Sequence, residues 1–344
     1  MHEEKTMKAL VMAGDRLVLE IRTSTAPGPG QARVRVRAVG ICATELHMLD
    51  GRVRFETMPE VPGHEVAGTV EDVGSGVDAA WIGQRVVIDP VIGCGLCRFC
   101  RTGRKLLCRQ GGEIGTTGPD GGYAQYVTVP VINLYHLPDT LSFETGALME
   151  PLNCTLGAFL KARVEPGESA LILGSGPAGL LFCQLARAAG CAPVRLVGRG
   201  RVRVSLAERF GVTETWIYKD ADLPEKARAV YQDQGPDLVI EASGANVAVQ
   251  QAFDWIHPGG RMILYGINGS GQANICSDAI IAKDLTLVTG IGAPLLWDQT
   301  IRTVERGLVD LQAMVTRCFP LEEAHEALAL ARDGDNAAKV VLCP

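Results

Sequence analysis

The sequence predicts an α/β protein with two domains, one rich in β-strands and one built around a parallel sheet. The length of 344 residues exceeds what one hydrophobic core comfortably holds. To about Pro151 the chain shows short strand-like runs broken by glycine and proline. From about Glu165 apolar strands alternate with predicted helices, and this order implies a parallel sheet.

The composition is that of an ordinary globular chain, with 47% hydrophobic and 21% charged residues. A net charge of −6 leaves no broad basic surface, so we expect no nucleic-acid partner. The N-terminal stretch lacks the apolar run of a signal peptide, and no stretch approaches the ~20 apolar residues that cross a bilayer. We therefore expect a cytoplasmic protein without membrane association, in which clustered thiols stay reduced and bind metal or do chemistry.

The first part begins with a strand in the run ARVRVRAVG, where small or apolar residues alternate with Arg33, Arg35 and Arg37. This period of two is typical of a strand with one exposed face. The runs VAGTVEDVGSGV, QRVVIDPVI and GGYAQYVTVP predict further strands.

Four cysteines follow in the spacing C-x2-C-x2-C-x7-C, namely Cys94, Cys97, Cys100 and Cys108. Four thiolates complete a tetrahedral zinc shell and leave no position for substrate, so this site is structural by nature. Neighbouring basic residues would favour thiolates over thiols, namely Arg98, Arg101, Arg104 and Lys105. The alternatives are unrelated thiols, a redox pair or an iron–sulfur cluster, although nothing else indicates electron transfer.

A catalytic metal needs a second set of ligands, and three stretches offer them. GICATELH contains Cys42, VPGHEVAG contains His64 and Glu65, and GALMEPLNC contains Glu150. One cysteine, one histidine and a carboxylate leave room on zinc for water or substrate. Each residue alone is more typical of core packing, and the argument depends on their occurring together.

The second part opens with an apolar strand, a glycine turn and a helix in SALILGSGPAGLLFCQLARAAG. Gly174, Gly176 and Gly179 form G-x-G-x-x-G, which allows a tight turn and close approach of a pyrophosphate to a helix N-terminus. Ser175 lies within the turn, and Pro177 and Ala178 fit the first helical turn. A glycine turn without a ligand is the alternative.

These elements together resemble a zinc-dependent medium-chain dehydrogenase/reductase of the alcohol dehydrogenase superfamily, over almost the whole chain. The resemblance implies a GroES-like catalytic domain over residues 1–151 and 292–344, with the structural zinc lobe at 93–108. It implies a Rossmann domain over 152–291, two zinc ions per chain and a homo-tetramer or dimer.

In that family the elements GICGTDxH and GHE supply the catalytic zinc ligands, here Cys42, His64 and Glu65. Glu150 in MEPL resembles the sorbitol, threonine and polyol dehydrogenase branch, in which either Glu65 or Glu150 could ligate zinc. Ala43 and Glu45 depart from the pattern, because glycine and aspartate are usual there. The usual aspartate holds the zinc histidine by a hydrogen bond. We expect Glu45 to reach His64 with altered geometry.

The cofactor preference depends on the strand VRLVG. An NAD-binding fold usually carries an acid about 20 residues past the glycine loop, and here Gly198 occupies that place, followed by Arg199, Arg201 and Arg203. Guanidinium groups can bind a 2′-phosphate, and Arg199 with Arg203 resembles the pair of NADP-preferring polyol dehydrogenases. We therefore expect NADP(H) over NAD(H), with a solvated basic turn as the alternative.

The resemblance implies hydride transfer between a secondary alcohol (a polyol, sugar alcohol or cyclitol) and its ketone. Thr44 would contact the reacting hydroxyl and His47 would carry its proton outward, because histidine titrates near neutrality. Thr155 would lie by the nicotinamide and Lys339 near the pyrophosphate. A 3-hydroxy amino acid (threonine-like) dehydrogenase and a non-catalytic nucleotide-binding protein remain as alternatives.

Overall fold

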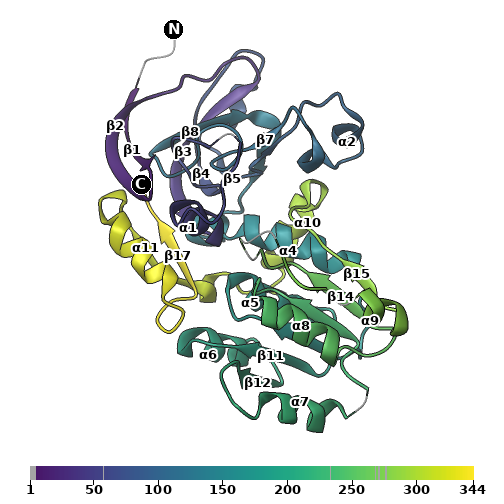
Figure 1. The fold of residues 1–344 in the computed structure, drawn as a ribbon. Helices are drawn as coiled ribbons and strands as arrows, with labels where there is room; N and C mark the ends of the chain where they lie inside the picture. The colour runs from purple at the N-terminus through teal and green to yellow at the C-terminus, as the bar shows by residue number, and fades with distance from the viewer. Residues whose placement is uncertain (1–4, 57, 233, 268, 270–271, 276) are drawn as a thin grey trace.

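The computed structural model describes residues 5–344 except 57, 233, 268, 270, 271 and 276. A β-rich part and a parallel-sheet part lie one above the other in Figure 1, with helix α4 (Met149–Lys161) between them. The C-terminal segment returns to the β-rich part, where strand β17 (Lys339–Leu342) pairs with β3 (Gln31–Gly40). No helix in the described part of the chain is long and apolar enough to span a membrane.

The β-rich part contains, among the described residues, a seven-stranded sheet in the order β16-β17-β3-β4-β5-β9, with β8 also paired to β3. All the runs from which strands were predicted here form strands. The further members of the sheet are β4 (Glu65–Val73), β5 (Arg85–Ile88), β8 (Tyr126–Pro130), β9 (Leu134–His136) and β16 (Val315–Phe319). Two small antiparallel pairs accompany it, β1 (Lys5–Ala13) with β2 (Arg16–Ser24) and β6 (Val91–Ile92) with β7 (Gly112–Glu113).

The predicted alternation along β3 is wrong at Arg33. Arg35 and Arg37 are exposed as expected, but the Arg33 side chain is only 2% exposed. It donates to Asp72 at 3.2 Å and lies over the ring of Tyr126. A guanidinium can be buried where a carboxylate on the neighbouring strand pairs with it.

The second part contains a parallel sheet of six described strands in the order β12-β11-β10-β13-β14-β15. If these six strands are numbered 1 to 6 in chain order, beginning at β10, their order across the sheet is 3-2-1-4-5-6. This order is typical of the dinucleotide-binding fold, and the parallel sheet was predicted correctly. The strands are β10 (Ala170–Leu173), β11 (Val194–Gly198), β12 (Glu214–Ile217), β13 (Leu238–Glu241), β14 (Arg261–Leu264) and β15 (Thr286–Val288).

Helices cover both faces of this sheet (Figure 1). Helix α4, α5 (Pro177–Ala188) and α6 (Arg201–Arg209) contribute buried residues to the hydrophobic cluster on one face. Helices α7 (Leu223–Tyr231) and α8 (Asn246–Trp255) do so on the other. The predicted domain boundary between residues 151 and 152 falls inside α4, and the division into domains stays a prediction.

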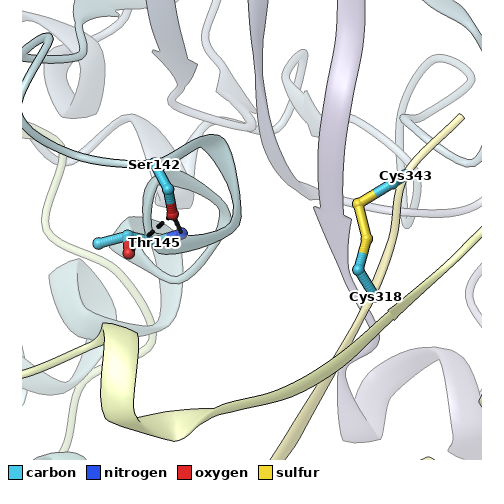
Figure 2. The surroundings of a disulfide bond; sticks show 4 residues. All are labelled: Ser142, Thr145, Cys318 and Cys343. Atoms are coloured by element: carbon cyan, nitrogen blue, oxygen red, sulfur yellow. Dashed lines mark hydrogen bonds between the residues drawn. A yellow bond between two sulfur atoms is a disulfide. The ribbon is translucent and has the colours of Figure 1, made fainter.

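The remaining α-helices are distributed over both parts and the region between them (Figure 1). A lobe bearing α2 projects from the β-rich part (Figure 1). The bounds are α1 (Ala43–Leu49), α2 (Arg98–Arg101), α3 (Phe143–Ala147), α9 (Ser277–Ala282), α10 (Trp297–Glu305) and α11 (Ala324–Arg332). Figure 2 shows a disulfide between Cys318 and Cys343 beside α3, which the sequence analysis did not predict.

Candidate active site

Cys42 lies where strand β3 ends and helix α1 begins. It occupies the N-cap of α1, and its backbone N–H donates to the Glu45 carboxylate at 2.9 Å. An acid three residues after the N-cap satisfies a backbone donor that the helix leaves open. The start of the helix therefore fixes where the Cys42 side chain stands.

His64 and Glu65 reach the same place from strand β4. Glu65 pairs with Gly40 across the antiparallel ladder, two residues before Cys42. The Glu65 carboxylate is buried and accepts from Lys339 Nζ at 2.5 and 2.7 Å. A Cβ on Gly40 would lie 1.8 Å from Glu65 Oε2, so glycine is required there to make room for the carboxylate.

The ligand atoms of Cys42, His64 and Glu65 lie within 4.8 Å of one another. Thiolate, imidazole and carboxylate are the donors that zinc binds in proteins, at distances of ~2.0–2.3 Å. His64 and Glu65 are buried, while Cys42 is partly exposed. The donor set and its spacing fit a zinc ion with an open position.

Glu45 makes the predicted contact with His64, with Oε1 2.6 Å from Nδ1. Burial lowers the pKa of His64, but the Glu45 carboxylate and Cys42 outweigh it and raise that pKa well above its ordinary value. A carboxylate on one ring nitrogen orients the other toward a metal. The extra methylene of glutamate thus preserves the contact that aspartate usually makes.

We expect Glu45→Ala to lower zinc affinity or activity by about 10–100-fold, because one carboxylate positions both Cys42 and His64. Competition with a chelator measures the affinity. Glu45→Asp is the matched variant and should stay closer to the parent protein. Equal zinc affinity in all three proteins would contradict this role.

Glu150 lies in the first turn of α4 and outside the group of three ligands. Burial raises its pKa to about 7, with Glu65 adding to the effect and His64 opposing it. The thiol of Cys154, one turn later on α4, donates to Glu150 Oε1 at 2.9 Å. Cys154 was missed in the sequence analysis, although its i+4 spacing from Glu150 was a usable signal.

Thr44 and His47 lie three residues apart on α1 and so share a helix face. Thr44 Oγ1 is 3.6 Å from Cys42 Sγ. Burial lowers the pKa of His47, with the positive charge of Arg52 adding to the effect. The pair lies beside the ligand group, on the helix that Cys42 caps.

Thr155 and Lys339 are both buried, and each makes a polar contact within the protein. Thr155 is fully buried, and its hydroxyl donates to the backbone carbonyl of Pro151 at 2.9 Å. Lys339 is 3% exposed and pairs with Glu65. Their contacts with a cofactor stay predictions.

The glycine loop joins β10 to α5 at the point where the strand order reverses. Gly174 has φ +118°, which disfavours other residues. A Cβ on Gly179 would lie 1.8 Å from the Gly174 carbonyl oxygen, whereas a Cβ on Gly176 would meet nothing within 4 Å. The third glycine thus allows helix and loop to pack, and the second faces open space where a pyrophosphate could approach.

Gly198, at the end of β11, packs on Ser175 of the glycine loop. A Cβ there would lie 2.5 Å from Ser175 Cβ. The Ser175 hydroxyl donates to the Arg199 carbonyl at 2.6 Å and accepts from the Arg199 N–H at 2.9 Å. An acidic side chain at position 198 is therefore excluded sterically, and Arg199 is exposed.

Arg203 is more constrained than Arg199. Its Nε donates to the carbonyl of Ala337 at 2.9 Å. Burial and the nearby charge of Arg199 lower its pKa, while Asp333 and Asp335 oppose the shift. Arg199 is the freer of the two for binding a ligand.

The four-cysteine lobe fits a tetrahedral ion. Cys100 Sγ lies 4.0 Å from Cys94 Sγ and 3.6 Å from Cys97 Sγ, close to the ~3.8 Å between sulfurs bound to one zinc at ~2.3 Å. Backbone N–H groups lower the pKa of Cys97 and of Cys108.

Three of the four neighbouring basic residues make other contacts than the predicted ones with the thiolates. Arg98 and Arg104 lie over the ring of Phe99, and Lys105 pairs with Asp89 at 2.6 Å. Backbone amides, rather than these side chains, lower the pKa of Cys97 and Cys108, whereas burial raises the pKa of Cys100 to about 11.

Two protein-family models match the chain. The model described as an alcohol dehydrogenase GroES-like domain matches residues 28–139, and the one described as a zinc-binding dehydrogenase matches residues 177–306. Sorbitol dehydrogenase of Bacillus subtilis (strain 168) is 29% identical, over 99% of this chain and 98% of that protein. L-threonine 3-dehydrogenase of the same organism is 31% identical, over 90% of this chain and 89% of its own.

Solved structures agree with this likeness. A putative zinc-binding dehydrogenase from Sinorhizobium meliloti 1021, bound to NADP, has a TM-score of 0.90 and 32% identity over 99% of this chain and 100% of its own. A protein from Escherichia coli CFT073 described as a short chain alcohol dehydrogenase, complexed with NADH, has a TM-score of 0.90. It is 25% identical, over 98% of this chain and 99% of its own. The β-rich part is thus GroES-like and the parallel sheet Rossmann-like.

Proposed function

Because the chain belongs to the zinc-containing medium-chain alcohol dehydrogenase family, we propose that it interconverts a secondary alcohol and its ketone with NADP(H). The chain is an NAD(P)-dependent zinc oxidoreductase of the polyol and threonine dehydrogenase type. The proposed substrate is a polyol, sugar alcohol or cyclitol. The grouping of Cys42, His64 and Glu65, oriented by Glu45, carries this proposal.

Cys42, His64 and one carboxylate would hold the catalytic zinc, and proximity favours Glu65 over Glu150. Bound zinc would lower the pKa of the substrate hydroxyl, and the nicotinamide would exchange the hydride. Lys339 balances the charge of Glu65, and Cys154 holds the Glu150 carboxylate. Four cysteines of the lobe would hold the second zinc, in a structural role.

Thr44 and His47 supply the proposed path for the proton. The Thr44 hydroxyl lies beside Cys42 and can accept the proton from the substrate oxygen while passing its own on. His47, on the same face of α1 and only partly buried, can deliver it to solvent. The lowered pKa of His47 keeps the imidazole neutral, and thus able to accept a proton, at neutral pH.

The proposal is tested by NADP+ reduction with zinc-loaded protein across polyols, sugars, simple alcohols and 3-hydroxy amino acids, repeated with NAD+. Faster turnover of a polyol supports the proposed substrate class. Preference for a 3-hydroxy amino acid would instead favour the threonine-like activity. Absence of cofactor binding would contradict a dehydrogenase of any specificity.

The NADP preference rests on the contact between Gly198 and Ser175. Because a hydroxyl occupies the space of the usual acid, no carboxylate repels a 2′-phosphate there. Ser175 also holds the backbone of Arg199, whose exposed guanidinium can bind the phosphate. Solved structures that share this fold hold NADP in one case and NADH in another.

We expect Arg199→Ala to raise KM for NADP+ by about 10–100-fold, since a hydrogen bond to a charged group contributes about 1.5–3 kcal/mol. KM for NAD+ should change little. Arg201→Ala is the matched control. Arg201 is also exposed, and its contact with Asp335 is made by the backbone N–H, which alanine retains. Equal losses for both cofactors would indicate that Arg199 does not read the 2′-phosphate.

A further inference from the structure

The disulfide between Cys318 and Cys343 closes the C-terminal segment on itself (Figure 2). Cys318 lies in β16, and Cys343 follows directly after the parallel neighbour β17. Their Cα atoms are 6.1 Å apart, within the usual range for native disulfides. Both residues are partly exposed and pack against the edge of the main hydrophobic cluster.

The loop of residues 318–343 contacts the candidate site at three places. Lys339 pairs with Glu65 at the ligand group. The carbonyl of Ala337 accepts from Arg203 beside the proposed 2′-phosphate site. Arg332 pairs with Asp50 at 2.5 Å, next to the helix that carries His47.

Helix α3 presents a carboxylate to the same sulfur atoms. A Glu144 oxygen lies within 4.8 Å of both. Ser142 caps α3 by accepting from the Thr145 N–H (Figure 2). The hydroxyls of Ser142 and Thr145 both donate to the side chain of Gln312, just before β16. Because the Glu144 carboxylate lies this close to both sulfur atoms, a neutral disulfide is a better neighbour for it than a thiolate.

We propose that Cys318 and Cys343 form a thiol–disulfide exchange site whose oxidised state anchors the 318–343 loop against the active site. The oxidant is a small-molecule disulfide of the glutathione type. One cysteine thiolate attacks it, breaks its S–S bond and releases one thiolate. The second cysteine then attacks the mixed disulfide and releases the other. The protein loses two electrons and two protons, and the small disulfide becomes two thiols.

The oxidised loop should be more stable because the closed chain has fewer unfolded conformations. Its contacts with Glu65, Arg203 and Asp50 would open less often when the loop is closed. The site is independent of the proposed function, because neither its chemistry nor its stability readout needs a substrate.

The test equilibrates the full-length, zinc-loaded protein in reduced or oxidised glutathione and then alkylates free thiols. Intact mass should show two fewer alkylated thiols after oxidation, and peptide mapping should place them at positions 318 and 343. We expect Tm to rise by roughly 5 °C on oxidation. Hydrogen exchange of residues 324–337 should slow at the same time.

Cys343→Ser should abolish both differences, whereas Cys183→Ser, at a buried thiol elsewhere, should retain them. Free thiols at both positions in excess glutathione disulfide would overturn the proposal. So would a disulfide that changes neither Tm nor exchange. A third zinc ion bound by the reduced protein and lost in Glu144→Gln would also overturn it, because the pair would then be a metal site.

Discussion

Replacing Cys42 with alanine should lower kcat/KM by at least about a thousand-fold and remove one of two zinc ions per chain. Cys42 is one of three side chains whose ligand atoms lie within 4.8 Å. A catalytic zinc stabilises the charge that develops in the transition state by several kcal/mol. Each 1.36 kcal/mol of activation free energy changes the rate tenfold. Elemental analysis and steady-state kinetics measure the two effects.

The fold should survive this change. Glu45 accepts from the backbone N–H of residue 42, and this contact does not need the thiol. Cys191→Ala is the matched control, because that thiol is buried in the core and its pKa is raised to about 11 by burial. The control should keep both zinc ions. Full activity in Cys42→Ala would place the reaction elsewhere.

The sequence predicted those parts of the site that short motifs carry. The glycine loop, the four-cysteine lobe and the residues Cys42 and His64 each come from a local pattern, and the comparisons confirm the family. The strand pattern was equally local, and it was wrong only at Arg33, where a partner on the next strand allows burial. Local patterns succeed because backbone geometry over a few residues determines them.

The contacts between distant residues could not be predicted in this way. Lys339 pairs with Glu65 across 274 positions. Cys318 and Cys343 carry no spacing signal, and their pairing follows from strand order alone. These contacts depend on which strands become neighbours, and the pattern of a single sequence does not carry that information.

The second large effect concerns the four-cysteine lobe. Cys100→Ala should remove the structural zinc and lower Tm by roughly 10 °C. Without zinc we expect the lobe to lose its shape, and Lys105, which belongs to it, would no longer pair with Asp89. Asp89 is 1% exposed, and losing the partner of a buried charge costs about 3–5 kcal/mol. Calorimetry and hydrogen exchange of residues 94–108 measure the change.

This loss should reach the active site only indirectly. Leu106 lies against Gly292, and the neighbouring Ala293 is held by Asn153 of α4 at 3.0 and 3.1 Å. We therefore expect the catalytic zinc to remain and kcat/KM to fall far less than in Cys42→Ala. Lys105→Met is the matched variant, since it removes the ion pair but should keep both zinc ions. If Cys100→Ala retained both zinc ions and the parent Tm, the four cysteines would not hold a structural metal.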